Sequence, residues 1–295
     1  MKQYKILIIS DIKNPRFIED MYIAKSFKKD GHIVKVLGIG YKKEYDAKFD
    51  IIIRRNTWEE NKLETLYYTI RNEMLVRRIY DYSIPAINVV GLQETDLEYM
   101  PKLLRKRIPN IYPTITDIDE LFLIMKDWST EKELIIRERQ QYLAKKNPSI
   151  TLKVEDIGKY FKDVEHVIQP NIEYKSQVQV HCIGNKIMYA FEYSPTKYNK
   201  FTNEKQIIIS EKDKKVINKI LKVSNLEYGM QRLDFVRLKN DDLLLYEIKD
   251  TNVHMNMEKL DFEKREEVIN EFKKNIYKFL KLNDEDKRFK IYGRI

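Results

Sequence analysis

One stretch of the sequence, residues 232 to 252, places two acidic residues on neighbouring predicted strands. It reads RLDFVRLKNDDLLLYEIKDTN, in which the polar run KNDD separates two apolar segments, as is typical of a β-hairpin. Asp234 lies in the first segment and Glu247 in the second. Because strand side chains alternate between faces, a suitable register brings both carboxylates to one face, where they repel unless a cation lies between them. Such oxygen ligands suit Mg²⁺ with a phosphate-bearing substrate, and the alternative is two solvated acids.

Composition narrows the function classes. No segment of the 295 residues is long and apolar enough to span a bilayer, and the N-terminus leads straight into a strand, so we expect a cytoplasmic protein without membrane contact. The single cysteine, Cys182, excludes an intramolecular disulfide and a cysteine-based zinc cluster. Of the four histidines, His181 in an apolar strand is expected in the core, and His254 lies nearest the acidic hairpin. The net charge of +9 favours anionic partners without separating nucleotides from nucleic acid.

Residues 1 to 92 read as a small open α/β domain. Apolar strand patterns alternate with helical patterns in the order β-α-β-β-α-β, over residues 4–10, 15–31, 32–40, 48–58, 62–82 and 84–91. Gly31 is a predicted helix C-cap. No Gly-x-Gly-x-x-Gly follows the first strand, which argues against dinucleotide binding. Ligands collect at the carboxyl end of such sheets, so the residues that end the third strand are predicted substrate contacts: Arg54, Arg55 and Asn56.

The rest of the chain reads as an α+β domain behind a linker. Residues 93–130 are predicted to form a helical bridge, with Thr116 or Asp117 as an N-cap. Short strands and one helix follow, then a helix before the acidic hairpin, and a C-terminal helix with mixed charges. Strands and helices that mix without strict alternation are typical of α+β folds.

This order of elements resembles the ATP-grasp superfamily, the carboxylate–amine ligases that include glutathione synthetase, the ribosomal S6 modification ligase and D-alanine–D-alanine ligase. The resemblance spans nearly the whole chain, from the α/β segment through the Pro113-Thr114 pair to the acidic strands. It implies an α/β preface domain followed by an α+β ATP-grasp domain with two lobes and a nucleotide cleft. The implied divisions are a preface at 1–92, a helical linker at 93–130, a small lobe at 131–172, and a large lobe at 173–295.

The resemblance also implies a site for ATP and Mg²⁺. Residues 166–172, HVIQPNI, match the hinge against which adenine lies, and Glu173 matches a ribose-binding acid. Asp234 and Glu247 match the carboxylates that hold Mg²⁺. The residues implied to bind the nucleotide are Arg137, Lys145, Gln169, Pro170 through its carbonyl, Ile172 through its N–H, and Glu173.

Several positions depart from the family pattern. Arg137 stands where the family has a phosphate-binding lysine, and a guanidinium still binds phosphate, bidentately. The loop that carries Lys145 lacks the usual glycines, and Leu97 replaces a lysine. Gln179 takes the place of a substrate-binding arginine, and Lys249 that of a metal-binding asparagine. Arg137 and Lys249 are therefore the predicted catalytic cations of an atypical site.

Three functions remain open from the sequence. The first is an ATP-dependent carboxylate–amine ligase that acts through an acylphosphate on small-molecule or peptide substrates, with a homo-oligomer left open. The second follows from Asp234, Glu247 and Lys249, which form the Asp…Glu-x-Lys pattern of metal-dependent nucleases; only then is nucleic acid an expected partner. The third is a catalytically degenerate nucleotide-binding protein. Lys249 is the residue on which the first two interpretations differ most.

Overall fold

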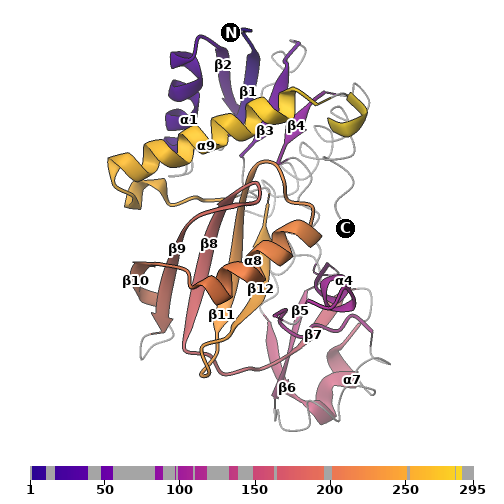
Figure 1. The fold of residues 1–295 in the computed structure, drawn as a ribbon. Coiled ribbons are helices and arrows are strands. Elements are labelled where there is room, and N and C mark those ends of the chain that lie inside the picture. The colour runs from indigo at the N-terminus through magenta and orange to yellow at the C-terminus, as the bar shows by residue number, and fades with distance from the viewer. Residues whose placement is uncertain are drawn as a thin grey trace.

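Three β-sheets make up the framework of the protein, seen in a computed structural model of the chain (Figure 1). The structure describes residues 2–10, 17–38, 48–55, 84–88, 97, 99–108, 110–117, 133–138, 149–162, 165–195, 201–250, 253–282 and 284–287. The predicted helix at 62–82 lies outside these ranges.

The first sheet is parallel and four-stranded, with strand order β2-β1-β3-β4. Its elements are β1 (Lys5–Ser10), α1 (Phe17–Lys29), β2 (Ile33–Gly38), β3 (Ile51–Arg54) and β4 (Ala86–Ile87). Residues 6–9 of the central strand are fully buried, as expected of a parallel strand covered on both faces. Gly31 has a φ of +85° just after α1, which confirms the predicted glycine cap.

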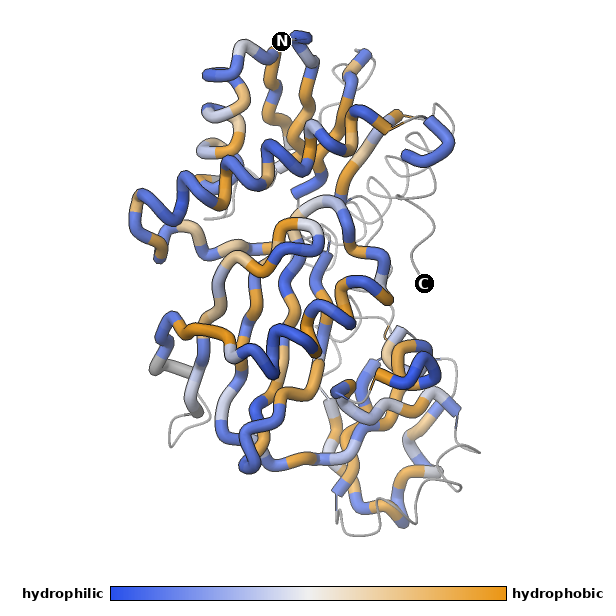
Figure 2. The backbone as a smooth tube through the Cα atoms, viewed as in Figure 1, coloured by the Kyte–Doolittle hydropathy of each residue, from blue (hydrophilic) through white to orange (hydrophobic). Residues whose placement is uncertain are grey.

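The C-terminal helix α9 (Phe262–Leu280) packs against this first sheet (Figure 1). Its Phe272 meets Phe27 of α1 edge to face, and the Tyr277 hydroxyl donates to Asp30 at 2.7 Å. Asp261 is the N-cap of this helix, and its carboxylate accepts a hydrogen bond from the Lys264 N–H. Hydrophilic and hydrophobic stretches alternate along it (Figure 2), which fits one buried and one solvated side.

The second sheet is antiparallel and five-stranded, in the order β10-β9-β8-β11-β12. Its strands are β8 (Ser176–Ile183), β9 (Lys186–Pro195), β10 (Phe201–Ile207), β11 (Met230–Arg237) and β12 (Leu243–Lys249). Helix α8 (Glu211–Val223) covers one face and buries Ile217 and Leu221 with Leu233. A 3₁₀ turn, η3 (Met257–Lys259), lies between β12 and α9.

The third sheet is small, with the order β6-β5-β7. It comprises β5 (Glu133–Glu138), β6 (Ile150–Lys153) and β7 (His166–Pro170), with η2 (Val154–Asp156) and α7 (Ile157–Tyr160) between the last two.

The segment before this sheet ties it to the second one. After α4 (Tyr99–Arg105), residues 110–117 run extended: Ile111 bridges to Leu245 of β12, and Ile115 bridges to Ile168 of β7. The prediction of a helical bridge is therefore wrong for these residues, because their main-chain groups pair with strand edges. The helix expected after Asp117 lies outside the described residues.

Candidate functional site

The two acids of the hairpin lie directly opposite each other. In the β11–β12 ladder Asp234 pairs with Glu247, and in the β8–β11 ladder Asp234 pairs with Gln179. Directly opposed residues of antiparallel strands point to the same face of the sheet. The structure therefore confirms that the two carboxylates share a face, and it adds the Gln179 side chain beside them.

A β-bulge in β12 adds an aromatic ring to this group. Asp234 pairs with Glu247 but Phe235 pairs with Leu245, so Tyr246 has no opposite residue on β11. The guanidinium of Arg137 lies over the Tyr246 ring, with 4.7 Å between its carbon and the ring centroid. Arg137 belongs to β5 of the small sheet, whereas Tyr246 belongs to the large sheet. This stacking brings the predicted phosphate-binding arginine next to the acidic strand.

Each carboxylate is held by a cation from its own strand. Arg232 donates to both oxygens of Asp234, at 2.8 and 2.9 Å, and the Lys249 ammonium lies 2.6 Å from Glu247. Arg232 and Lys249 are themselves opposite each other in the ladder, so the four residues form a charge square of two acids and two cations. Burial raises the pKa of Asp234 more than the neighbouring cations lower it. Arg232 was missed in the sequence, although its i, i+2 spacing from Asp234 puts it on the same face.

The charge square offers a place for Mg²⁺ among the described residues. Two opposed carboxylates are the hard oxygen donors that Mg²⁺ prefers. A bare Mg²⁺ would have to displace Lys249 from Glu247 and lie near the Arg232 charge, which is unfavourable in a partly buried site. A ligand that carries phosphates could instead take over both cations while the metal takes the acids. The donor set thus fits Mg²⁺ that arrives together with an anionic ligand.

The predicted hinge lies at the end of β7, and a tyrosine occupies its main-chain groups. The Tyr112 hydroxyl donates to the Pro170 carbonyl at 2.7 Å and accepts from the Ile172 N–H at 3.2 Å. Gln169 is fully buried and binds the Thr114 hydroxyl at 2.9 Å and Arg137 at 3.3 Å.

The structure therefore brings together four of the predicted nucleotide-binding residues: Arg137, Gln169, Pro170 and Ile172. It does not bring Glu173 with them. The Glu173 side chain is exposed and pairs with Lys239 in the turn of the acidic hairpin. Lys145 lies outside the described residues.

Arg55 was predicted to contact a substrate, and the structure places it in a buried ion-pair network. Its guanidinium is buried and binds Glu19 and Asp20, each at 2.7 Å, and the Val253 carbonyl at 2.6 Å. Glu19 in turn accepts the N–H groups of Met255 and Met257. Arg55 thus ties α1 to the segment after β12.

The other substrate and family positions are less informative. Arg54 is buried, and Asn56 lies outside the described residues. Leu97 is a fully buried core residue beneath the large sheet, so this position could not present a charged side chain without reshaping that core.

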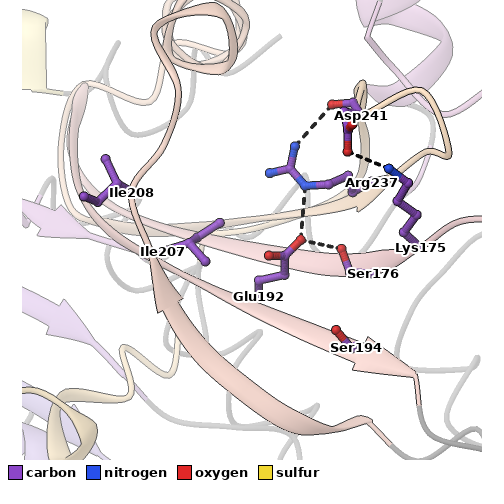
Figure 3. A pocket seen from close by; sticks show the side chains of 8 residues that line it. All are labelled: Lys175, Ser176, Glu192, Ser194, Ile207, Ile208, Arg237 and Asp241. Atoms are coloured by element: carbon purple, nitrogen blue, oxygen red, sulfur yellow. Dashed lines mark hydrogen bonds and ion pairs between the residues drawn. The ribbon is translucent and has the colours of Figure 1, made fainter.

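Two further polar features lie outside the charge square. Glu19, His254 and Glu258 bring three potential ligand atoms within 4.8 Å of one another. A separate pocket of about 420 Å³ is lined by Arg237, Glu192 and their neighbours (Figure 3). There Glu192 accepts from Ser176 at 2.6 Å and from Arg237 at 3.1 Å, so these charges neutralise each other, and no predicted site residue lines the pocket.

None of the helices in the described part of the chain has the length and apolar character needed to cross a membrane.

Comparison with known proteins gives the fold. No protein-family model matches the sequence, and no curated protein matches it either. Solved structures do match along almost the whole chain. D-cycloserine synthetase DcsG superimposes with a TM-score of 0.66 at 12% identity, covering 94% of this chain and 99% of that one. A RiPP-associated ATP-grasp ligase from Chryseobacterium gregarium, in complex with ADP and a leader and core peptide, gives a TM-score of 0.65 at 11% identity, covering 94% of this chain and 97% of that one.

D-alanine–D-alanine ligase from Bacillus anthracis, in complex with ATP, gives a TM-score of 0.61 at 13% identity and covers 95% of this chain and 99% of that one. Because such similarity extends over all three sheets, the ATP-grasp resemblance stated from the sequence is confirmed at the level of the fold. The low identities agree with the departures seen at single positions of the site.

Proposed function

We propose that this chain of ATP-grasp fold is an ATP-dependent carboxylate–amine ligase whose site is the charge square together with Arg137 and the β7 hinge. The observation that carries the proposal is the direct opposition of Asp234 and Glu247 on one sheet face, with Arg137 of the facing sheet stacked beside them. Acids that share a face and lie next to cations are suited to hold a metal and a polyphosphate together.

The cations and the carboxylates of the site have different roles. Arg137, Arg232 and Lys249 bind and orient the triphosphate, which releases the two carboxylates from their ion pairs. Bound Mg²⁺ supplies charge neutralisation at the phosphates. A substrate carboxylate then attacks the γ-phosphorus, giving an acylphosphate and ADP. An amine attacks the acyl carbon, loses a proton and expels phosphate, so an amide forms. Catalysis here is chiefly positioning and charge neutralisation.

The proposed substrates rest on the reaction just described and on what the structural neighbours bind or are named for. A structural neighbour was solved with a leader and core peptide, and another is a D-alanine–D-alanine ligase. We therefore propose a peptide or small-molecule carboxylate and amine as substrates. Gln179, opposite Asp234, is the proposed contact on the large sheet. Arg54, at the end of β3, and Asn56 also remain proposed contacts. The domain boundaries, the cytoplasmic location and a homo-oligomer remain predictions.

No observation specifically favours the nuclease alternative. The fold likeness to ligases covers 94–95% of the chain, so it includes most of residues 1 to about 205, which a nuclease leaves unexplained. Lys249 pairs with Glu247 in a way that serves either chemistry.

Calorimetric titration with AMP-PNP and Mg²⁺ tests the proposal. We expect saturable binding that Glu247→Gln weakens about tenfold or more, since a charged metal contact is worth at least ~1.4 kcal/mol. Glu271→Gln is the matched control, because Glu271 also pairs with a lysine, Lys186 at 2.8 Å, but on the helix α9. Absence of heat with ATP, ADP and AMP-PNP at high protein concentration would refute the ligase.

Two other results would select the alternatives. Metal-dependent cleavage of plasmid DNA that Lys249→Ala abolishes would establish the nuclease instead. Tight nucleotide binding without ADP formation, across panels of carboxylates and amines, would identify a degenerate nucleotide-binding protein.

A further inference from the structure

The hydroxyl of Tyr112 makes two hydrogen bonds with the hinge at once. It donates to the Pro170 carbonyl at 2.7 Å and accepts from the Ile172 N–H at 3.2 Å. A single oxygen thus presents a donor and an acceptor to two main-chain groups that are two residues apart. In the proposed function, these two main-chain groups would otherwise hydrogen-bond to a nucleotide base.

Adenine presents the same pattern along its pairing edge. Its exocyclic amine is a donor and the adjacent ring nitrogen is an acceptor, which matches a carbonyl followed by an N–H. Guanine reverses the pattern, with an acceptor oxygen and a ring N–H donor at the corresponding places. An open hinge with these two groups would therefore favour adenine, because guanine would place donor against donor and acceptor against acceptor.

Tyr112 is held in place from several sides. Its main-chain N–H donates to the Leu245 carbonyl at 2.8 Å, within the extended linker segment. Its ring meets that of Tyr246 edge to face, with 5.5 Å between centroids, and the residue is only 3% exposed. Burial raises the pKa of its phenol to about 12, so the hydroxyl keeps its proton at neutral pH. The side chain is packed as part of the wall and not as a loose surface group.

We propose that Tyr112 is a specificity-determining residue that takes the hinge's donor and acceptor away from the nucleotide base. This inference rests on the proposed function, namely that the hinge and the charge square bind a nucleoside triphosphate. The triphosphate then provides the recognition through Arg137 and the charge square, and the base is bound without being read. Nucleoside triphosphates that carry adenine and those that carry guanine therefore bind with similar affinity.

Removal of the whole phenol should expose the hinge. Tyr112→Phe would leave the ring against the same two main-chain groups, so a base could not reach them. In Tyr112→Ala both the ring and its hydroxyl are absent, and the Ile172 N–H keeps only its contact with the Pro170 carbonyl at 3.1 Å. Both groups then become available to adenine, and two recovered hydrogen bonds correspond to roughly a tenfold gain for adenine over guanine.

Calorimetric titrations with AMP-PNP and GMP-PNP, each with Mg²⁺, test the proposal. The wild type should bind the two within about threefold of each other, and Tyr112→Ala should favour AMP-PNP by about tenfold. Tyr174→Ala is the matched control: it removes a nearby phenol whose hydroxyl contacts Gln177 at 3.3 Å and not the hinge, and it should show the wild-type ratio.

A wild type that already prefers AMP-PNP tenfold, or a Tyr112→Ala ratio equal to that of the wild type, would overturn the role of Tyr112 while leaving the ligase proposal standing. Failure of every variant to bind either nucleotide would refute the proposed function itself, and this inference with it. Thermal melting checks that Tyr112→Ala is folded. If it is not, Tyr112→Val also removes the ring, and the same ratios decide.

Discussion

Replacement of Arg55 by methionine should destabilise the protein more than any surface substitution, in a manner that depends on pH. The Arg55 guanidinium pairs with both Glu19 and Asp20, and the exposed fraction of all three side chains is 3% or less. Arg55→Met keeps an apolar stem in place but leaves two buried carboxylates without their counter-ion.

The expected loss of stability depends on the hydrogen bonds that each carboxylate retains. Glu19 keeps the Met255 and Met257 N–H groups, and Asp20 keeps the Ser10 hydroxyl. Because neither acid loses all its partners, the loss should be that of one broken buried pair, about 3–5 kcal/mol, and not twice that value. At neutral pH such a loss lowers the urea midpoint by about 1 M or more.

The dependence on pH has a definite sign. Burial already raises the pKa of Asp20 above its usual value despite Arg55, and without Arg55 this pKa rises further. A carboxyl group whose pKa is higher in the folded state stabilises the fold while it is protonated, and that stability is lost as the pH rises through the folded pKa. The penalty of Arg55→Met should therefore shrink between pH 7 and pH 5.

Urea denaturation at both pH values measures this penalty. Arg265→Met is the control, since Arg265 donates to the carbonyls of Met257 and Leu260, at 3.0 Å each, and to no acid. It should cost about 1 kcal/mol at both pH values. An Arg55→Met penalty below 1 kcal/mol at pH 7, or one that does not change with pH, would refute the role given to this ion-pair network.

Four other predictions concern particular residues. Gly184→Ala should lower stability by about 2–4 kcal/mol in urea denaturation, because φ is +52° and the new Cβ would lie 2.3 Å from the Glu227 carbonyl oxygen; a loss under 0.5 kcal/mol would contradict this. Asp261→Ala should cost about 1 kcal/mol by thermal melting, as α9 loses its N-cap, and an unchanged melt would argue against the cap. Cys182 is fully buried and burial raises its thiol pKa, so it should react with a thiol reagent only after unfolding. Both ring nitrogens of buried His181 lack a hydrogen-bond partner among the described residues, and burial lowers its pKa, so the wild type should lose stability as pH falls below about 6.5, and His181→Phe should lose less.

The sequence predicted the acidic hairpin well because its signals are local. Alternation of apolar residues and the KNDD turn specify two strands in register, and the opposition of Asp234 and Glu247 follows from that pairing. The parallel sheet was equally readable from continuous apolar strands. Strand β10 was missed because an edge strand exposed to solvent carries polar residues without clear alternation.

What the sequence could not provide are the contacts between distant segments. Tyr112 is 58 residues from its partner Pro170, and Arg55 is 198 residues from Val253. Neither pair leaves a periodic pattern. The extended path of residues 110–117 was missed for the same reason, since it depends on strand edges supplied by β7 and β12. Arg55 looked like a ligand contact because it ends a strand, and only the position of Glu19 and Asp20 shows its other role.

The binding of Mn²⁺, used in place of Mg²⁺ and followed by electron paramagnetic resonance, tests the central claim most directly. Since each acid of the charge square is neutralised by its own cation, we expect weak Mn²⁺ binding to the protein alone and one tightly bound Mn²⁺ per chain once AMP-PNP is added. Glu247→Gln should abolish the tight site. Tight Mn²⁺ binding that needs no nucleotide and is lost in Glu247→Gln would contradict the account. So would an AMP-PNP-dependent tight site that survives Glu247→Gln.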